Sequence, residues 1–275
     1  MTIKLLTVEE HQQVVERLLE FEENVKITRP HSAGIEYTSL MTCFLSQNMV
    51  AAKTLVKLRN SFDAEWFPAS IGYIIVRTMF EVDVIAHYIT QDPVKRSRQY
   101  IQFERVLDKR EMDACDKHRS SSDPQWREAM NIIWQKHWSS SQTIINTKYK
   151  AVQQRYETIT KKGKALPFQN WSGKSIRQMA IEVDHKEAYD IFYAELSSFT
   201  HVDVRLANRF LRIRPNGLTW TQRVISFDVG NVFRYAAIFL TCFLELYANQ
   251  FGVFSKDDIK SCWNIGGVYQ NDYKY

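Results

Sequence analysis

Apolar residues recur at helical spacing along most of the chain, so the pattern predicts an all-α fold. The first helix opens at a capping box formed by Thr7 and Glu10 and ends before Pro30. The stretch 68–90 is apolar on nearly every side, which is typical of a buried central helix. We expect the other helices over residues 34–59, 92–118, 124–160, 176–183, 186–210 and 226–251.

A short ribbon is the one departure from helices that the pattern predicts. Asn216 and Gly217 lie between two β-prone runs, and this dipeptide favours a tight hairpin turn. We therefore expect a single multi-helix, bundle-like domain with one small β-hairpin near 210–223. Its parts are an N-terminal helix over 1–33, a core over 34–251 and a C-terminal tail over 252–275.

The composition fits a helical globular protein and excludes several classes of site. Hydrophobic residues make up 45% of the chain, and only 9 Gly and 6 Pro interrupt it. No P-loop and no dinucleotide-binding fingerprint occurs. We expect no cofactor and no metal, because the four cysteines are far apart and lack metal-ligand spacing. They are Cys43, Cys115, Cys242 and Cys262.

Charge and hydropathy set the expected location and partners. The net charge of +5 permits an anionic partner. The N-terminus shows no secretory signal, and the most apolar run, Tyr235 to Leu244, is too short to span a membrane. We predict a cytoplasmic protein without a membrane partner. The candidate partners are RNA or another nucleic acid, a second protein, or a second copy of the chain.

A polar stripe runs along the helix predicted over 186–210. Tyr193, Ser197 and His201 repeat every four residues, so their side chains stack on one face. A neutral imidazole can act as a general base near pH 7, which makes His201 the candidate base. The alternative is a core histidine bonded to a neighbouring helix. Ser197 is a weaker candidate nucleophile, because it lies inside a helix and no Gly-x-Ser-x-Gly elbow is present.

A charged pair lies on the predicted central helix. Arg77 and Glu81 are four residues apart, and a buried charge is tolerated only when it is paired. The pair either fixes helix packing or lines an internal pocket. Asp83 and His87 on the same helix are expected to point elsewhere, toward solvent or a helix end.

Basic residues fall into two groups, one over 148–164 and one after His201. Arginines beside aromatic residues can hold phosphates and stack on bases, which favours nucleic-acid binding. The alternative is a solvated basic face. The candidate nucleic-acid-binding residues are Arg205, Arg209, Arg212, Arg214 and Trp220.

Three motifs carry a family resemblance. They are Arg77-x-x-x-Glu81, the run from Trp171 to Arg177 (WSGKSIR), and Tyr193-x-x-x-Ser197-x-x-x-His201. Together they resemble a large bacterial family of all-helical proteins that is catalogued as a domain of unknown function. The resemblance covers residues 39–251 and implies a helical fold with a shared internal polar cluster. It supplies no reaction.

The chain is more loosely similar to the HEPN helical superfamily, which includes toxin and phage-defence ribonucleases. Their mark is an arginine followed, after four to six residues, by a histidine. Arg177 and His185 have seven residues between them, so this sequence departs from the mark. Two hypotheses follow. One is a helical binding or regulatory module in a phage-defence or toxin–antitoxin setting; the other is a metal-independent ribonuclease that uses His201 with Arg77 or Arg177.

Overall fold

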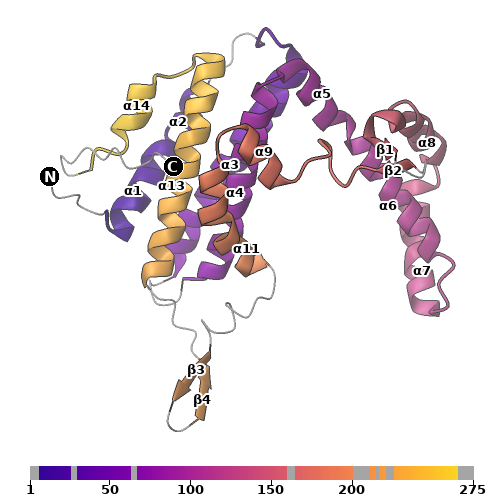
Figure 1. Ribbon diagram of the computed structural model, residues 1–275. Helices are drawn as coiled ribbons and strands as arrows, with labels where there is room; N and C mark the ends of the chain where they lie inside the picture. The colour runs from indigo at the N-terminus through magenta and orange to yellow at the C-terminus, as the bar shows by residue number, and fades with distance from the viewer. Residues whose placement is uncertain are drawn as a thin grey trace. The chain divides into compact units, whose positions relative to one another are not determined.

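The computed structural model describes residues 6–25, 30–62, 67–159, 165–200, 211–214, 217–220 and 226–265. Helices occupy more than half of the 275 residues, so the all-α prediction is confirmed. The chain separates into two compact units (Figure 1). The first unit comprises residues 1–91 and 176–275, and the second comprises residues 92–175.

The first unit is built around two long helices, α4 and α13. Helix α4 packs against α3, α9, α11 and α13, and α13 also packs against α1 and α3. Figure 1 shows the other helices of this unit beside them. The helices are α1 (Val8–Leu19), α2 (Phe21–Asn24), α3 (Ile35–Ser61), α4 (Ala69–Thr90), α9 (Ile176–Glu182), α10 (Lys186–Ala188), the π-helical turn η3 (Tyr189–Tyr193), α11 (Ala194–Thr200), α13 (Ser226–Phe251) and α14 (Lys256–Ser261).

Close packing holds α4 at the centre, as its apolar sequence predicts. Twelve of its 22 residues are buried. A Cβ atom at Gly72 would lie 2.9 Å from the Val232 side chain and 3.1 Å from the Phe67 side chain, so glycine permits the close approach of α13. Further along, the rings of Phe80 and Phe239 lie 5.2 Å apart, and both are fully buried. These aromatic contacts form the core between the two helices.

Helix α13 is longer than the apolar run at its centre. By length and composition, Asp228–Phe251 could cross a membrane, with a mean hydropathy of 1.4 over the most apolar window. Within the protein, 72% of that window is buried. A mostly buried core helix passes the same test of length and composition. The cytoplasmic location therefore stays a prediction.

The second unit is a smaller helical bundle with its own core. That core consists of Met112, Cys115, Trp134 and Ile145. The elements are α5 (Pro93–Gln102), α6 (Glu104–His118), α7 (Pro124–Ile133), the π-helical turn η1 (Trp134–Trp138), α8 (Gln142–Lys150), the 3₁₀ turn η2 (Gln153–Tyr156), β1 (Glu157–Ile159) and β2 (Ala165–Pro167).

The prediction of one long helix over 124–160 is wrong. The α-helical pattern stops after Ile133, and the backbone N–H of Ser139 bonds to the carbonyl of Trp134, five residues back. The hydroxyls of Ser139 and Ser141 bond to main-chain carbonyls one turn earlier. Hydroxyls of this kind compete with the helical ladder.

Strands are found in two places. β1 and β2 pair antiparallel, with Glu157 opposite Pro167, so the prediction that strands flank Asn216 alone is wrong. In the segment of the predicted hairpin, β3 (Leu211–Arg214) pairs antiparallel with β4 (Gly217–Trp220). The helix predicted over 186–210 is described as far as Thr200, and η3 interrupts it.

Candidate functional site

Arg77, Glu81 and Tyr193 form a closed hydrogen-bonded triangle between α4 and η3. Arg77 donates from Nε to Glu81 Oε1 at 2.9 Å and from Nη2 to the Tyr193 hydroxyl oxygen at 2.8 Å. The Tyr193 hydroxyl donates to Glu81 Oε1 at 3.0 Å. The side chains of Arg77 and Glu81 are 19% and 31% exposed, so the pair is half-buried rather than sealed in the core.

The triangle keeps its charges in place. Burial lowers the pKa of Arg77, but the Glu81 carboxylate outweighs burial and the pKa is raised. Burial and Glu81 both raise the pKa of Tyr193, so its hydroxyl keeps its proton at neutral pH. The Tyr189 ring stacks on Tyr193 at 4.5 Å. The Glu81 carboxylate already offsets the positive charge of Arg77. The triangle therefore suits a structural link between α4 and η3 better than a phosphate-binding site.

The other candidates from the sequence do not join this triangle in the part of the chain that the structure describes. Arg177 is exposed, and its Nε lies 3.5 Å from Asp190 Oδ1. Ser197 is half-buried on α11. His201, Arg205 and Arg209 lie outside the described residues, and Arg212, Arg214 and Trp220 are placed by the backbone of β3 and β4 alone.

The structure brings together a second polar cluster, formed by Asp83, His87 and His185. Asp83 is fully buried on α4. Its Oδ1 lies 3.3 Å from Nδ1 of His87, and its Oδ2 lies 3.5 Å from Nε2 of His185. The two imidazole rings lie 4.6 Å apart. We refer to these three residues as the Asp83 cluster.

The prediction that Asp83 and His87 point toward solvent or a helix end is wrong. Helices pack against α4 on several sides, so this polar position faces protein rather than water. The spacing of Asp83 and His87 was visible in the sequence. The third member, His185, lies about a hundred residues later, and only the fold places it beside them.

The charges within the Asp83 cluster depend on one another. Burial would raise the pKa of the Asp83 carboxyl, but His87 and His185 outweigh burial and lower that pKa to about 2. Burial lowers the pKa of His87, but the Asp83 carboxylate outweighs it and the pKa is raised. Asp83 is therefore ionised across the physiological range, and it favours the protonated form of His87.

A helix-ending turn positions His185. The N–H of His185 bonds to the carbonyl of Ala180, and the N–H of Asp184 bonds to the carbonyl of Ile181, which is the Schellman pattern at the end of α9. Asp184 occupies the left-handed position of this turn, with φ of 63°. The Gln91 side chain donates to the Glu182 carbonyl at 2.7 Å. These bonds fix the turn against the end of α4.

Replacing Asp184 with glycine is expected to stabilise the protein by roughly 0.5–1 kcal/mol. Glycine adopts the left-handed conformation without the steric cost of a Cβ atom. The measurement is the free energy of unfolding by denaturant. Asp184→Val serves as the control and should destabilise, because β-branched residues tolerate this conformation poorly. A loss of stability in Asp184→Gly would show that the aspartate side chain contributes more than the strain costs.

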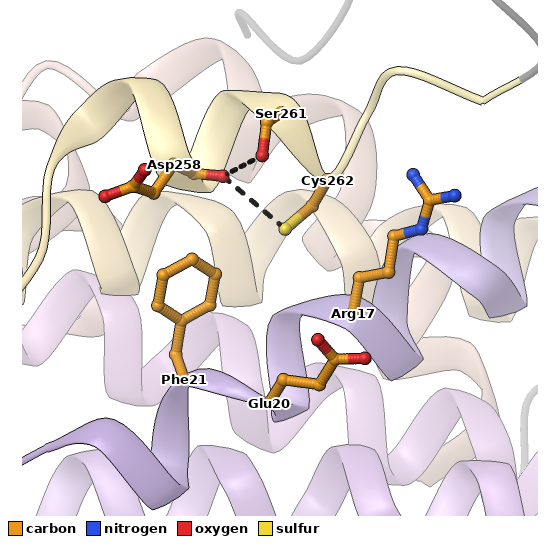
Figure 2. Close-up of a pocket in the computed structure, with 6 residues that line it drawn as sticks. All are labelled: Arg17, Glu20, Phe21, Asp258, Ser261 and Cys262. Atoms are coloured by element: carbon orange, nitrogen blue, oxygen red, sulfur yellow. Dashed lines mark hydrogen bonds between the residues drawn. The ribbon is translucent and has the colours of Figure 1, made fainter.

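A surface pocket of about 310 Å³ lies where α14 meets α1 and α2. Figure 2 shows Arg17, Glu20 and Phe21 on one side and Asp258, Ser261 and Cys262 on the other. The Asp258 carbonyl accepts hydrogen bonds from the Ser261 hydroxyl and the Cys262 thiol. Burial raises the pKa of that thiol to about 11, so it is not a thiolate at neutral pH. The pocket therefore offers no activated nucleophile.

The comparison with known families settles where the chain belongs. A family of unknown function, DUF5677, matches residues 40–218. The chain belongs to DUF5677. The segment shared with DUF5677 includes α4, α9 and η3, and therefore both polar clusters. No curated protein and no solved structure matches the chain.

Proposed function

We propose that this protein is a helical binding module for nucleic acid, and that its second unit carries the charge that holds phosphates. The observation behind this proposal is the distribution of charge between the two units. Residues 92–175 contain 17 Lys and Arg against 9 Asp and Glu, a net charge of +8. The rest of the chain has a net charge of −3.

The surface of the second unit suits a polyanion. Cationic side chains that reach phosphates release condensed counterions, which is the main source of affinity for RNA and DNA. Trp126 is 49% exposed on α7, where a base can stack on its ring. A surface hollow is lined by Arg127 and Lys136 together with Glu128 and Ile132. The exposed cations of this unit include Lys95, Arg98, Lys117, Arg127, Lys136, Lys148, Lys150 and Arg155.

The hydrogen bonds of Arg77 favour a binding role over a catalytic one. Its guanidinium is engaged with Glu81 and Tyr193, so its charge is already compensated. The ribonuclease hypothesis depends on His201, which lies outside the described residues. The HEPN similarity and the phage-defence or toxin–antitoxin setting stay predictions from the sequence. The candidates Arg205, Arg209, Arg212, Arg214 and Trp220 stay a prediction from the sequence.

The binding test is a titration of fluorescently labelled single-stranded RNA over a series of salt concentrations. Lys148→Gln with Lys150→Gln is expected to weaken binding several-fold at moderate salt. The slope of log K against log salt should become shallower by about 1.4, because each single-strand phosphate contact contributes about 0.7. The matched control is Lys256→Gln with Lys260→Gln on α14, which removes the same charge from the first unit.

Equal weakening by the two double variants would contradict the proposal, because charge in general rather than the second unit would then hold the RNA. Binding that does not depend on salt would also contradict it. RNA recovered intact from the wild-type protein fits a binding module. RNA shortened by wild type, but not by His201→Ala, would instead support the ribonuclease and overturn a purely binding role.

A further inference from the structure

We propose that Asp83, His87 and His185 form a binding site for one divalent transition-metal ion, with Zn²⁺ as the ion that fits best. The site lies in the first unit and is independent of RNA binding by the second. Its three residues each offer one ligand atom, and these atoms all lie within 4.8 Å of one another. The sequence led us to expect no metal, because the cysteines lack metal-ligand spacing. Spacing in the sequence could not reveal a site whose residues come together only in the folded chain.

One distance in the cluster fits two donors that share an ion. A gap of 3.5 Å separates Asp83 Oδ2 from His185 Nε2. Zinc binds imidazole nitrogen and carboxylate oxygen at about 2.0–2.2 Å. Two such donors on one tetrahedral ion lie roughly 3.3–3.6 Å apart. The observed gap therefore matches one edge of a coordination polyhedron.

The donor types favour zinc over the hard cations. Magnesium and calcium take six or more oxygen ligands, whereas this cluster offers a single carboxylate and two imidazoles. Two nitrogens with one carboxylate form a common ligand set of zinc and non-haem iron sites. Three protein ligands would leave a coordination position for water. Such a site could supply a Lewis acid in addition to a structural link.

Contacts with Asp83 orient one of the two histidines. Nδ1 of His87 lies 3.0 Å from the main-chain carbonyl oxygen of Asp83 and 3.3 Å from Oδ1 of the same residue, which fixes the orientation of this ring. The side chains of His87 and His185 are 22% and 12% exposed, whereas Asp83 has no exposure, so an ion can enter past the imidazoles.

The helix-ending turn before His185 accounts for the position of this imidazole. Left-handed backbone at a non-glycine residue costs free energy and persists where the surrounding structure requires it. Here Asp184 adopts that conformation directly before His185. The turn brings the imidazole back onto α4, where the buried Asp83 lies.

The test is a calorimetric titration of chelator-treated, full-length protein with ZnCl₂. We expect one ion per chain, and no binding of Mg²⁺ at the same concentration. His87→Gln and His185→Gln should each weaken zinc binding by about 10–100-fold or more, because each removes a ligand. His137→Gln, an exposed histidine of the second unit, is the matched control and should bind as wild type. Far-UV circular dichroism shows that each variant keeps its fold.

Two further readouts do not depend on any activity. Zinc at about 100 times its Kd should raise the Tm of wild type by roughly 5–10 °C, and this rise should be lost in His185→Gln. Cobalt in place of zinc should give visible absorption without a thiolate charge-transfer band. Absence of saturable binding would overturn the proposal. Undiminished binding in both histidine variants, or a thiolate band from a site such as the exposed Cys43, would overturn it equally.

Discussion

Replacing Asp83 with alanine is expected to lower the free energy of unfolding of the metal-free protein by about 3–5 kcal/mol near pH 6. Asp83 is fully buried and is the carboxylate between two imidazoles. Removing one partner of a buried ionic cluster leaves the other charge buried without compensation. Denaturant unfolding, followed by far-UV circular dichroism, gives the size of the loss.

The pH dependence of this loss separates electrostatics from packing. The lowered pKa of Asp83 adds stability above about pH 3.9, its unfolded value, and this stability is lost as pH falls toward 2. The raised pKa of His87 adds stability that is fully present below about pH 6.5, and this is lost as pH rises through the folded pKa. The difference between wild type and variant should therefore be largest between about pH 4 and 6.5. A difference of the same size at pH 5 and pH 9 would show that only the cavity matters.

Replacing Phe239 with alanine is expected to cost about 3–5 kcal/mol, as for other large-to-small changes at fully buried aromatic residues. Phe239 on α13 has no exposed surface, and its ring lies 5.2 Å from that of Phe80 and 5.8 Å from that of Phe192. The substitution removes contacts that join α13 to α4 and to η3. The free energy of unfolding in denaturant measures the loss.

Phe62→Ala is the matched control for this prediction. Phe62 follows the end of α3 and is 43% exposed, so the same chemical change removes little buried surface. Its effect should stay within about 0.5 kcal/mol. Similar losses in Phe62→Ala and Phe239→Ala would mean that the contact between α4 and α13 is not the stabilising core of the first unit.

The sequence predicted those features of the fold that depend on residues close together in the chain. The capping box at Thr7 and Glu10 is present, because both hydrogen bonds join residues three apart. The central helix was expected over 68–90 and is found at Ala69–Thr90, because its apolar run requires burial whatever surrounds it. The π-turn at Trp134 was not predicted, since it depends on that ring reaching the core of the second unit.

The candidate sites show the same division. Spacing of four on one helix predicted that Arg77 meets Glu81, and the structure pairs them at 2.9 Å. Periodicity alone gave no sign that Tyr193 would close the triangle across 112 residues. It also misjudged Asp83, because an amphipathic pattern assigns polar residues to water and takes no account of helices that pack from the other side. Long-range packing determines both features.

The position of the second unit within the chain has a consequence for how this family can change. The chain leaves the first unit after Gln91 and re-enters it at Ile176, so the basic unit is an insertion within another fold. The cores of the two units consist of different residues. Substitutions on the inserted surface can therefore leave the Phe80–Phe239 contact and the Asp83 cluster as they are.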